Sequence, residues 1–240
     1  MKNLNHHKSQ HQILLELNRP PEARLENGII GSNHETLAAL RNFILSKYTQ
    51  SKSFIIWGNQ GSGKSFWLQA WTNEISNSKY FDLKHDILTE YTKKNILILD
   101  NLEFASDQNQ SFVFKLFNLH ESSNTKILAS TACPEQLNNK NMFRQDLFSR
   151  MKQGLIYKLD PLSDFEKKLA LKEYILSVGW LTSLKDTKYD PLLEYMLQRF
   201  PRQLPILKYI LIKTHNSALA NKCPVTIPLV KSIMEKVLNE

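Results

Sequence analysis

Residues 58–65 have the types and spacing of a loop that binds phosphate. The stretch reads Gly-Asn-Gln-Gly-Ser-Gly-Lys-Ser, which is the full G-x-x-x-x-G-K-S pattern. An apolar run at 54–57 precedes it, and a segment that can form a helix follows it. The glycines allow backbone N–H groups to point at phosphate oxygens, and the start of the helix adds its positive dipole end. The predicted cofactor contacts are Gly58, Asn59, Gln60, Gly61, Ser62, Gly63, Lys64 and Ser65.

Two side chains of this loop and one acid further along predict ATP or ADP bound with Mg²⁺. Lys64 is placed to reach the β- and γ-phosphates, and Ser65 to offer its hydroxyl to the metal. Residues 95–100 read Asn-Ile-Leu-Ile-Leu-Asp, a buried-strand run that ends in an acid. Asp100 at the end of such a strand lies beside the phosphate loop and can hold Mg²⁺ through water. Ser65 and Asp100 are therefore the predicted Mg²⁺ contacts.

The residue after Asp100 argues against fast hydrolysis. Most ATPases of this kind carry a second acid there, which polarises the attacking water, whereas this chain has Asn101, which cannot act as a base. Glu103 is a candidate substitute, although the sequence does not give its direction. We expect a site that binds nucleotide well and hydrolyses it slowly when alone. On the next apolar run, Ser130 or Thr131 is a candidate sensor of the γ-phosphate, with a simple strand-end cap as the alternative.

The elements around these residues predict an α/β fold. Apolar runs near 54–57, 80–83, 95–100, 127–131 and 155–159 read as strands that alternate with helical segments, including a short helix over 85–91. This order predicts a parallel sheet flanked by helices, with the ligand at the carboxyl ends of the strands. Beyond Pro161 only helical signals occur, beginning with a capping box at Ser163 and Glu166. We expect an N-terminal tail at 1–22, a nucleotide-binding domain at 23–160 and a small, all-helical lid domain at 161–240.

The amino-acid composition indicates a folded globular protein and argues against a membrane protein. Hydrophobic residues make up 42% of the 240 residues, enough for a proper core, and no apolar run approaches a membrane span. The net charge of +8 is spread along the chain, so a solvated basic surface is favoured over a DNA-binding stripe, and direct DNA contact is expected to be weak or absent. Cys133 and Cys223 are far apart and read as free thiols rather than a disulfide. We expect a cytoplasmic protein with no membrane association.

The N-terminal tail carries a short apolar segment at 12–17, followed by two prolines. In one interpretation the segment packs on its own domain as an edge strand or a helical turn. In the other it is a docking peptide for another protein, with Gln12 making a polar contact and spaced apolar side chains entering a groove. The predicted partner contacts are Gln12, Ile13, Leu14, Leu15 and Leu17.

Several stretches, in their order and spacing, resemble the Hda family of DnaA-related AAA+ proteins. They are Leu-Asp-Asn-Leu-Glu at 99–103, Asp-Leu-Phe-Ser-Arg-Met-Lys-Gln-Gly-Leu-Ile-Tyr-Lys-Leu at 146–159, Pro-Leu-Ser-Asp at 161–164 and Thr-Ile-Pro-Leu-Val-Lys at 226–231. The resemblance extends from about residue 12 to the C-terminus. It implies an AAA+ domain with a helical lid and a regulator that inactivates the bacterial replication initiator, DnaA.

The resemblance also assigns roles to particular residues. It implies that the segment beginning at Gln12 binds the sliding clamp of DNA polymerase III. Arg150 is similar to the arginine finger that this family presents in trans to a neighbouring subunit, where it stabilises charge on the transferring phosphoryl group. Arg202 is similar to the lid arginine that touches bound nucleotide. For both arginines the alternative is an ordinary surface salt bridge, and a homodimer is compatible with the resemblance.

We therefore expect a regulator that holds nucleotide, docks on the clamp and stimulates ATP hydrolysis by DnaA. One alternative is an autonomous AAA+ ATPase that acts on DNA or loads a replication protein. Another is a DnaA-related domain that only binds nucleotide. Because Asn101 replaces the second acid, the first interpretation is favoured, since a partner's hydrolysis needs only a nucleotide-stabilised shape in this chain.

Overall fold

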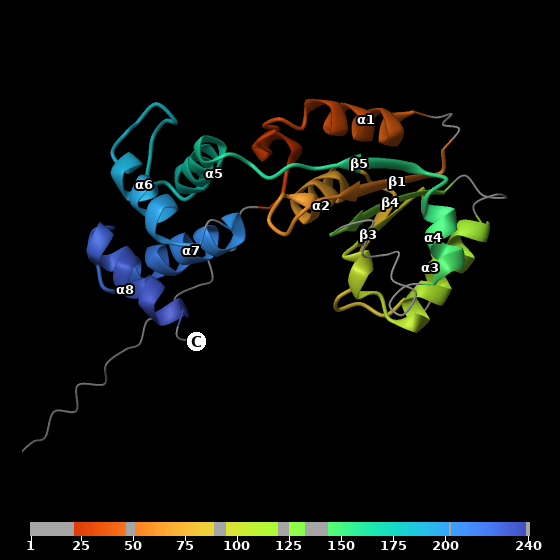
Figure 1. Ribbon diagram of the computed structural model, residues 1–240. Helices are drawn as coiled ribbons and strands as arrows, with labels where there is room; N and C mark the ends of the chain where they lie inside the picture. The colour runs from red at the N-terminus through yellow and green to blue at the C-terminus, as the bar shows by residue number, and fades with distance from the viewer. Residues whose placement is uncertain are drawn as a thin grey trace, which may run out of the picture.

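A five-stranded parallel sheet forms the centre of the N-terminal part of the chain (Figure 1). The computed structural model describes residues 22–46, 51–88, 95–119, 125–132, 144–201 and 203–238. The strands are β1 (Ser53–Trp57), β2 (Ser78–Asp82), β3 (Ile96–Asp100), β4 (Lys126–Thr131) and β5 (Leu155–Lys158), in the order β2-β3-β4-β1-β5. Every neighbouring pair is parallel, so all carboxyl ends lie at one edge of the sheet.

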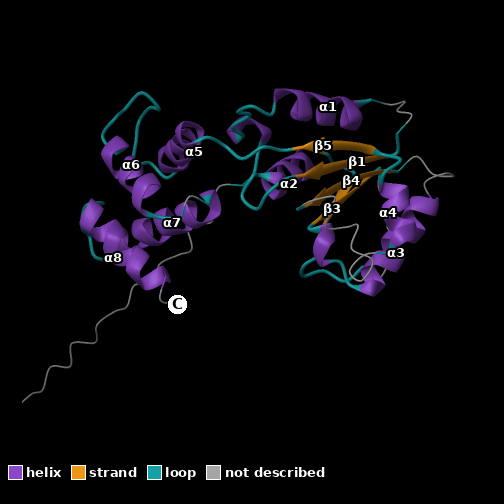
Figure 2. Ribbon diagram, in the orientation of Figure 1, coloured by secondary structure: helices purple, strands orange, loops and turns teal. Residues whose placement is uncertain are grey.

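Helices cover both faces of this sheet (Figure 2). On one face, α1 (His34–Leu45) and α2 (Lys64–Glu74) pack against alternate strand residues such as Phe54, Ile98 and Leu128. On the other face, α3 (Asp107–Leu119) and α4 (Gln145–Met151) pack against the intervening residues. Since both faces are covered, the central strands read as continuous apolar runs rather than alternating ones.

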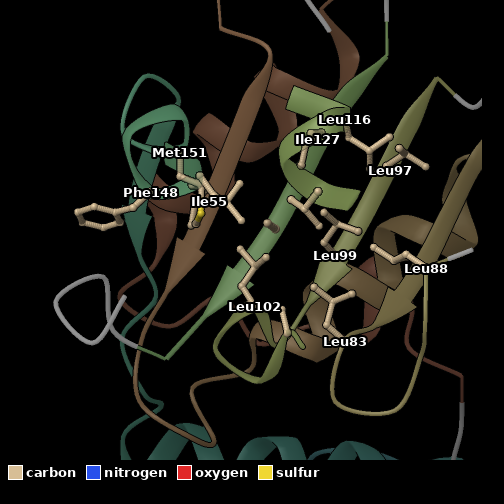
Figure 3. Packing of buried hydrophobic residues seen from close by; sticks show 14 residues of the cluster. Ile55, Leu83, Leu88, Leu97, Leu99, Leu102, Leu116, Ile127, Phe148 and Met151 are labelled. Carbon is tan, nitrogen blue, oxygen red and sulfur yellow. The ribbon is translucent and has the colours of Figure 1, made fainter. Parts of the chain in front are cut away.

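The apolar core between the sheet and the α3–α4 face also holds the turn after β3 and helix α4 in place (Figure 3). Ile55, Leu99 and Ile127 project from three strands into one cluster. Leu102, which follows β3 in the short 3₁₀ turn η2 (Leu102–Phe104), and Met151 of α4 join the same cluster and are buried. Burial of large apolar side chains of this kind contributes about 1.5–3 kcal/mol each. The turn after β3 and the last turn of α4 are therefore held by the sheet core.

The C-terminal part is entirely helical over the described residues, with α5 (Asp164–Ser177), α6 (Asp190–Arg199), α7 (Leu204–Ala220) and α8 (Ile227–Leu238). These helices share a separate apolar core. The predicted capping box is present: the Ser163 hydroxyl accepts from the Glu166 backbone N–H, and the Glu166 carboxylate accepts from the Ser163 N–H at 2.7 Å. The predicted fold class, a flanked parallel sheet followed by a helical lid, is confirmed.

The short helix predicted over 85–91 is wrong for the residues that the structure describes there. Residues 83–85 form a turn, and 86–88 have no regular structure. The cause is a contact from α3: the Asn109 amide donates to the Asp86 carbonyl at 2.8 Å, and its oxygen accepts from the Leu88 N–H at 2.9 Å. A buried side chain thus takes the backbone groups that a helix would use.

Among the helices of the described residues, none combines the length and the apolar composition that a membrane span requires.

Lid stability should depend on pH through His215 of α7. His215 is buried, and its Nδ1 accepts a hydrogen bond from the Trp180 indole, which requires that nitrogen to be unprotonated. Burial lowers the pKa of His215, so the unfolded chain, with an ordinary value of about 6.5, takes up the proton first. Stability is therefore full above this value and is lost as the pH falls through and below it.

Denaturant unfolding between pH 8 and pH 5, followed by the tryptophan fluorescence to which Trp180 of the lid contributes, should show a falling midpoint on the acid side. In His215→Phe the fall across this window should flatten. A wild-type midpoint that rises toward pH 5 would contradict the assignment.

Candidate nucleotide-binding site

The loop at 58–63 connects β1 to α2 with a backbone that needs glycine. A Cβ on Gly58 would lie 2.3 Å from the Leu159 carbonyl oxygen, so only glycine fits beside that backbone. Gly61 and Gly63 have φ of +82° and +99°, the left-handed region that glycine adopts without strain. The Gly58 N–H donates to the carbonyls of Thr131, the last residue of β4, and of Ala132, at 3.3 and 3.2 Å. The loop is therefore fixed at the carboxyl ends of β1 and β4, where the sequence places the ligand.

Lys64 is the cation of this loop and is buried. Its ammonium donates to the Gly58 carbonyl at 2.6 Å and to the Asn59 carbonyl at 3.2 Å. Burial lowers the pKa of Lys64, while the carboxylates of Glu103 and Asp100 raise it, with the larger contribution from Glu103. Neutral carbonyls are weak partners for a desolvated ammonium, and phosphate oxygens are stronger acceptors at the same place.

Asp100, at the end of β3, is fully buried and held by three donors. Its Oδ2 accepts from the Tyr80 hydroxyl at 2.7 Å, and its Oδ1 accepts from the Asn101 N–H at 3.0 Å and from the Ser130 hydroxyl. Burial first, and then the bond to Asp100, raises the pKa of Tyr80, which stays protonated as the donor. A carboxylate has about four acceptor positions, so roughly one remains for a metal-bound water. The fixed orientation fits the role predicted for Asp100 toward Mg²⁺.

Asn101 does not face the phosphate loop. Its backbone is left-handed, with φ of 59°, and its amide donates to Asp82 Oδ1 at 2.8 Å, at the end of the neighbouring strand β2. Asparagine adopts this conformation more readily than most residues. The chain then enters η2, which brings Glu103 back toward Lys64. The β2–β3 register pairs Asp82 with Asp100 and so brings the Asp82 carboxylate within reach of the Asn101 amide.

Unsatisfied buried polar atoms gather at this edge of the sheet. In the described chain four buried side-chain atoms lack a hydrogen-bond partner: Ser62 Oγ, Glu103 Oε2, Thr131 Oγ1 and Asp190 Oδ1. The last lies 2.8 Å from the Lys172 ammonium in the C-terminal helices. The other three come from the phosphate loop, the turn after β3 and the end of β4. Buried polar groups without a hydrogen-bond partner are uncommon, and they indicate a place that a ligand or water occupies. The site therefore fits phosphate and a hydrated cation.

Solved structures give the fold its class. Domain III of the replication initiation protein DnaA from Thermotoga maritima matches with a TM-score of 0.69 at 22% identity, covering 90% of this chain and 97% of that one. AMPPCP-bound DnaA from Aquifex aeolicus matches with a TM-score of 0.58 at 22% identity, covering 80% and 66%. The chain has a DnaA-like AAA+ fold.

Sequence comparison finds relatives of this chain as well. An uncharacterized protein of Haemophilus influenzae is 28% identical over 239 residues, covering 93% of this chain and 98% of that protein. No protein-family model matches the sequence. The RuvB Holliday junction branch migration motor of Thermotoga maritima also shares the fold, with a TM-score of 0.53 at 14% identity and coverage of 83% and 66%.

Arg150 lies at the opposite edge of the AAA+ sheet from the phosphate loop. It is in the last turn of α4 and is partly exposed, and the turn after it brings Gly154 against Ser53, the first residue of β1. The loop follows Trp57, the last residue of that strand. Five residues of strand span roughly 17 Å, which an arginine side chain does not bridge. The structure thus brings the loop, Asp100 and Thr131 together and leaves Arg150 apart from them.

Helix α4 is anchored from α3 as well as from the core. The Gln110 side chain accepts from the Arg144 N–H at 2.9 Å and donates to the Ala105 carbonyl at 2.9 Å. This bridge joins the start of α4 to the turn that follows β3. Gln110 therefore links the helix that carries Arg150 to the backbone at Ala105, just after the turn that carries Glu103.

Some predicted residues lie outside the described part of the chain. These are Gln12, Ile13, Leu14, Leu15 and Leu17 of the tail, the lid arginine Arg202, and Cys133. Their roles stay predictions. Sequence reasoning missed Tyr80 and Asp82, whose contacts with Asp100 and Asn101 depend on the β2–β3 register, which no local pattern specifies.

Proposed function

We propose that this chain is an AAA+ regulator of replication initiation of the Hda type. It binds ATP or ADP with Mg²⁺, docks on the DNA polymerase III sliding clamp and stimulates ATP hydrolysis by DnaA. The observation that carries the proposal is a phosphate loop with buried, unsatisfied polar atoms on a fold that resembles DnaA domain III. On this proposal the protein works in the cytoplasm, and its contact with DNA is indirect, through the clamp.

Nucleotide binding is supported by the loop and by the neighbours. Lys64 and the loop N–H groups are the phosphate contacts, with Thr131 at the γ-phosphate and Arg202 as a further nucleotide contact. Ser65 and Asp100 hold Mg²⁺, which neutralises phosphate charge when bound. Two structural neighbours are described with AMPPCP or ADP, namely DnaA from Aquifex aeolicus and NtrX from Brucella abortus.

Action in trans is supported by the position of Arg150. Arg150 and the phosphate loop of the same chain are separated by the length of a strand. The Arg150 side chain therefore cannot reach a nucleotide bound in its own chain. Its partial exposure at the far edge suits contact with a second molecule. The initiator, which shares the AAA+ fold, offers a complementary nucleotide site, and a homodimer is the alternative partner.

Clamp docking is tested by reconstituting hydrolysis of initiator-bound ATP with DNA-loaded clamp. Wild-type protein should stimulate the release of phosphate, and Gln12→Ala should lose most of this stimulation because the peptide's polar anchor is removed. The same variant should be retained less by immobilised clamp, whereas Asn27→Ala, outside the peptide, should behave as wild type. Equal stimulation by wild type and Gln12→Ala would contradict docking through this peptide.

An autonomous AAA+ motor is the second candidate, favoured by the buried Oε2 atom of Glu103, whose carboxylate raises the pKa of Lys64, and by the likeness to RuvB. Such a motor turns over ATP briskly and responds to DNA. Steady-state hydrolysis by the isolated protein, with and without DNA, separates the two: brisk, DNA-stimulated turnover supports the motor, and slow, DNA-independent turnover supports the regulator.

A further inference from the structure

We propose that Glu103 takes the place of the missing second acid and acts on the water that attacks ATP bound in this chain's own site. The inference rests on the proposed nucleotide binding and adds a slow intrinsic conversion of bound ATP to ADP. It assigns the catalytic role to a residue three positions after Asp100, in place of Asn101.

The first step of the argument is the local backbone. At Asn101 the chain turns through a left-handed conformation, and the Asn101 amide is committed to Asp82 at 2.8 Å. The 3₁₀ turn that follows is closed by the Phe104 N–H and the Ala105 N–H, which donate to the Asn101 and Leu102 carbonyls at 3.0 Å each. The turn begins directly after the left-handed Asn101, so Glu103 stays close to the edge where β3 ends.

The second step is packing, which holds this turn in place. Leu102 is buried in the sheet core and is 1% exposed, while Phe104 on the other side of Glu103 is 56% exposed. Figure 3 shows Leu102 pointing into the cluster with Ile127 and Leu99. With Leu102 directed inward, the turn has little freedom to rotate, and Glu103 is kept near the loop lysine, whose pKa its carboxylate raises.

The third step is the electrostatic environment of the carboxylate. Glu103 Oε2 is buried and has no hydrogen-bond partner in the described chain, an unusual state for a carboxylate oxygen. The Glu103 carboxylate raises the pKa of Lys64 more than the Asp100 carboxylate does, while burial lowers it. Asp100 already accepts hydrogen bonds from Tyr80, Asn101 and Ser130, whereas Glu103 Oε2 has an acceptor position open to a water.

The chemistry of the step is a hydrolysis that needs no other reactant. The oxygen of a water held by Glu103 forms a bond to the γ-phosphorus of ATP, and the bond from that phosphorus to the β–γ bridging oxygen breaks. ADP leaves with the bonding electron pair, and the water's proton passes to the Glu103 carboxylate and then to phosphate or solvent. Positioned carboxylates of this kind typically contribute about 10²–10⁴-fold.

The test compares wild type, Glu103→Gln and Glu74→Gln, an exposed acid at the end of α2. Single-turnover hydrolysis of bound ATP should fall by at least about 10²-fold in Glu103→Gln and stay within about twofold in Glu74→Gln. Binding of ATP and ADP, measured by calorimetry, should change by less than about threefold in both. After incubation with ATP, nucleotide extracted from Glu103→Gln should remain ATP, while that from wild type should be ADP.

Four results would overturn the inference. The first is wild-type protein that binds ATP and never converts it, which leaves nucleotide binding intact. The second is equal hydrolysis by wild type and Glu103→Gln. The third is hydrolysis that is retained in Glu103→Gln and lost in a further variant, Asn101→Gly, which keeps the left-handed turn. The fourth is loss of both ATP and ADP binding in Glu103→Gln alone, which makes Glu103 a structural residue. Failure of wild type to bind any nucleotide would instead refute the proposed function, and this inference with it.

Discussion

Arg150→Ala should lower clamp-dependent hydrolysis of initiator-bound ATP by about 10³-fold or more, to the initiator's basal rate. An arginine finger supplied in trans stabilises the charge of the phosphoryl group in transfer and contributes about 10³–10⁵-fold in rate. Arg150 projects from a helix that is fixed by Phe148 and Met151 in the sheet core and by the Gln110 bridge. These anchors are made by residues other than Arg150, so they remain in the variant, and its unfolding temperature checks that the fold is kept.

Two further variants separate a finger from a general surface charge. Arg150→Lys keeps the charge and loses the planar fork of donors, so it should recover little of the rate. Arg41→Ala removes an exposed arginine on α1, on the other face of the sheet, and should leave the rate unchanged. Clamp retention and nucleotide affinity should match wild type in all three. Unchanged initiator hydrolysis with Arg150→Ala would refute the finger role.

The strands and the phosphate loop were predictable because their signals are local. Parallel strands covered on both faces are continuous apolar runs, as 96–99 and 127–129 are. The left-handed backbone of the phosphate loop likewise favours glycine at positions 61 and 63. The helical start at Ser163 was predictable for the same reason, since both partners of its capping box lie within four residues.

The remaining features depend on contacts between segments far apart in the sequence. Residues 86–88 follow the side chain of Asn109 rather than their own propensity. The contacts of Asp100 with Tyr80 and Ser130 arise from three neighbouring strands in register. The direction of Glu103 depends on the left-handed turn at Asn101, which asparagine permits without requiring. The nucleotide edge was therefore predictable as a place, and its hydrogen bonds were not.

Lys64→Met should weaken binding of ATP and ADP by about 10²-fold without weakening the fold. A charge-assisted hydrogen bond contributes about 1.5–3 kcal/mol, and 1.4 kcal/mol is tenfold in affinity. The ammonium is buried against two neutral carbonyls, and burial lowers the pKa of Lys64, so the folded chain bears a desolvation cost that methionine removes. The nucleotide-free variant should therefore unfold at the same temperature as wild type or a higher one.

The rise in unfolding temperature on adding nucleotide measures the loss of affinity in Lys64→Met most directly. At a nucleotide concentration of 100 times the wild-type dissociation constant, binding stabilises the fold by about 2.7 kcal/mol, and a 10²-fold weaker variant by only about 0.4 kcal/mol. Lys185→Met, an exposed lysine of the lid, should show the full wild-type shift in unfolding temperature. A nucleotide-free Lys64→Met that unfolds well below wild type would show that the lysine serves the loop's own structure. A retained nucleotide shift would show that phosphate is held elsewhere.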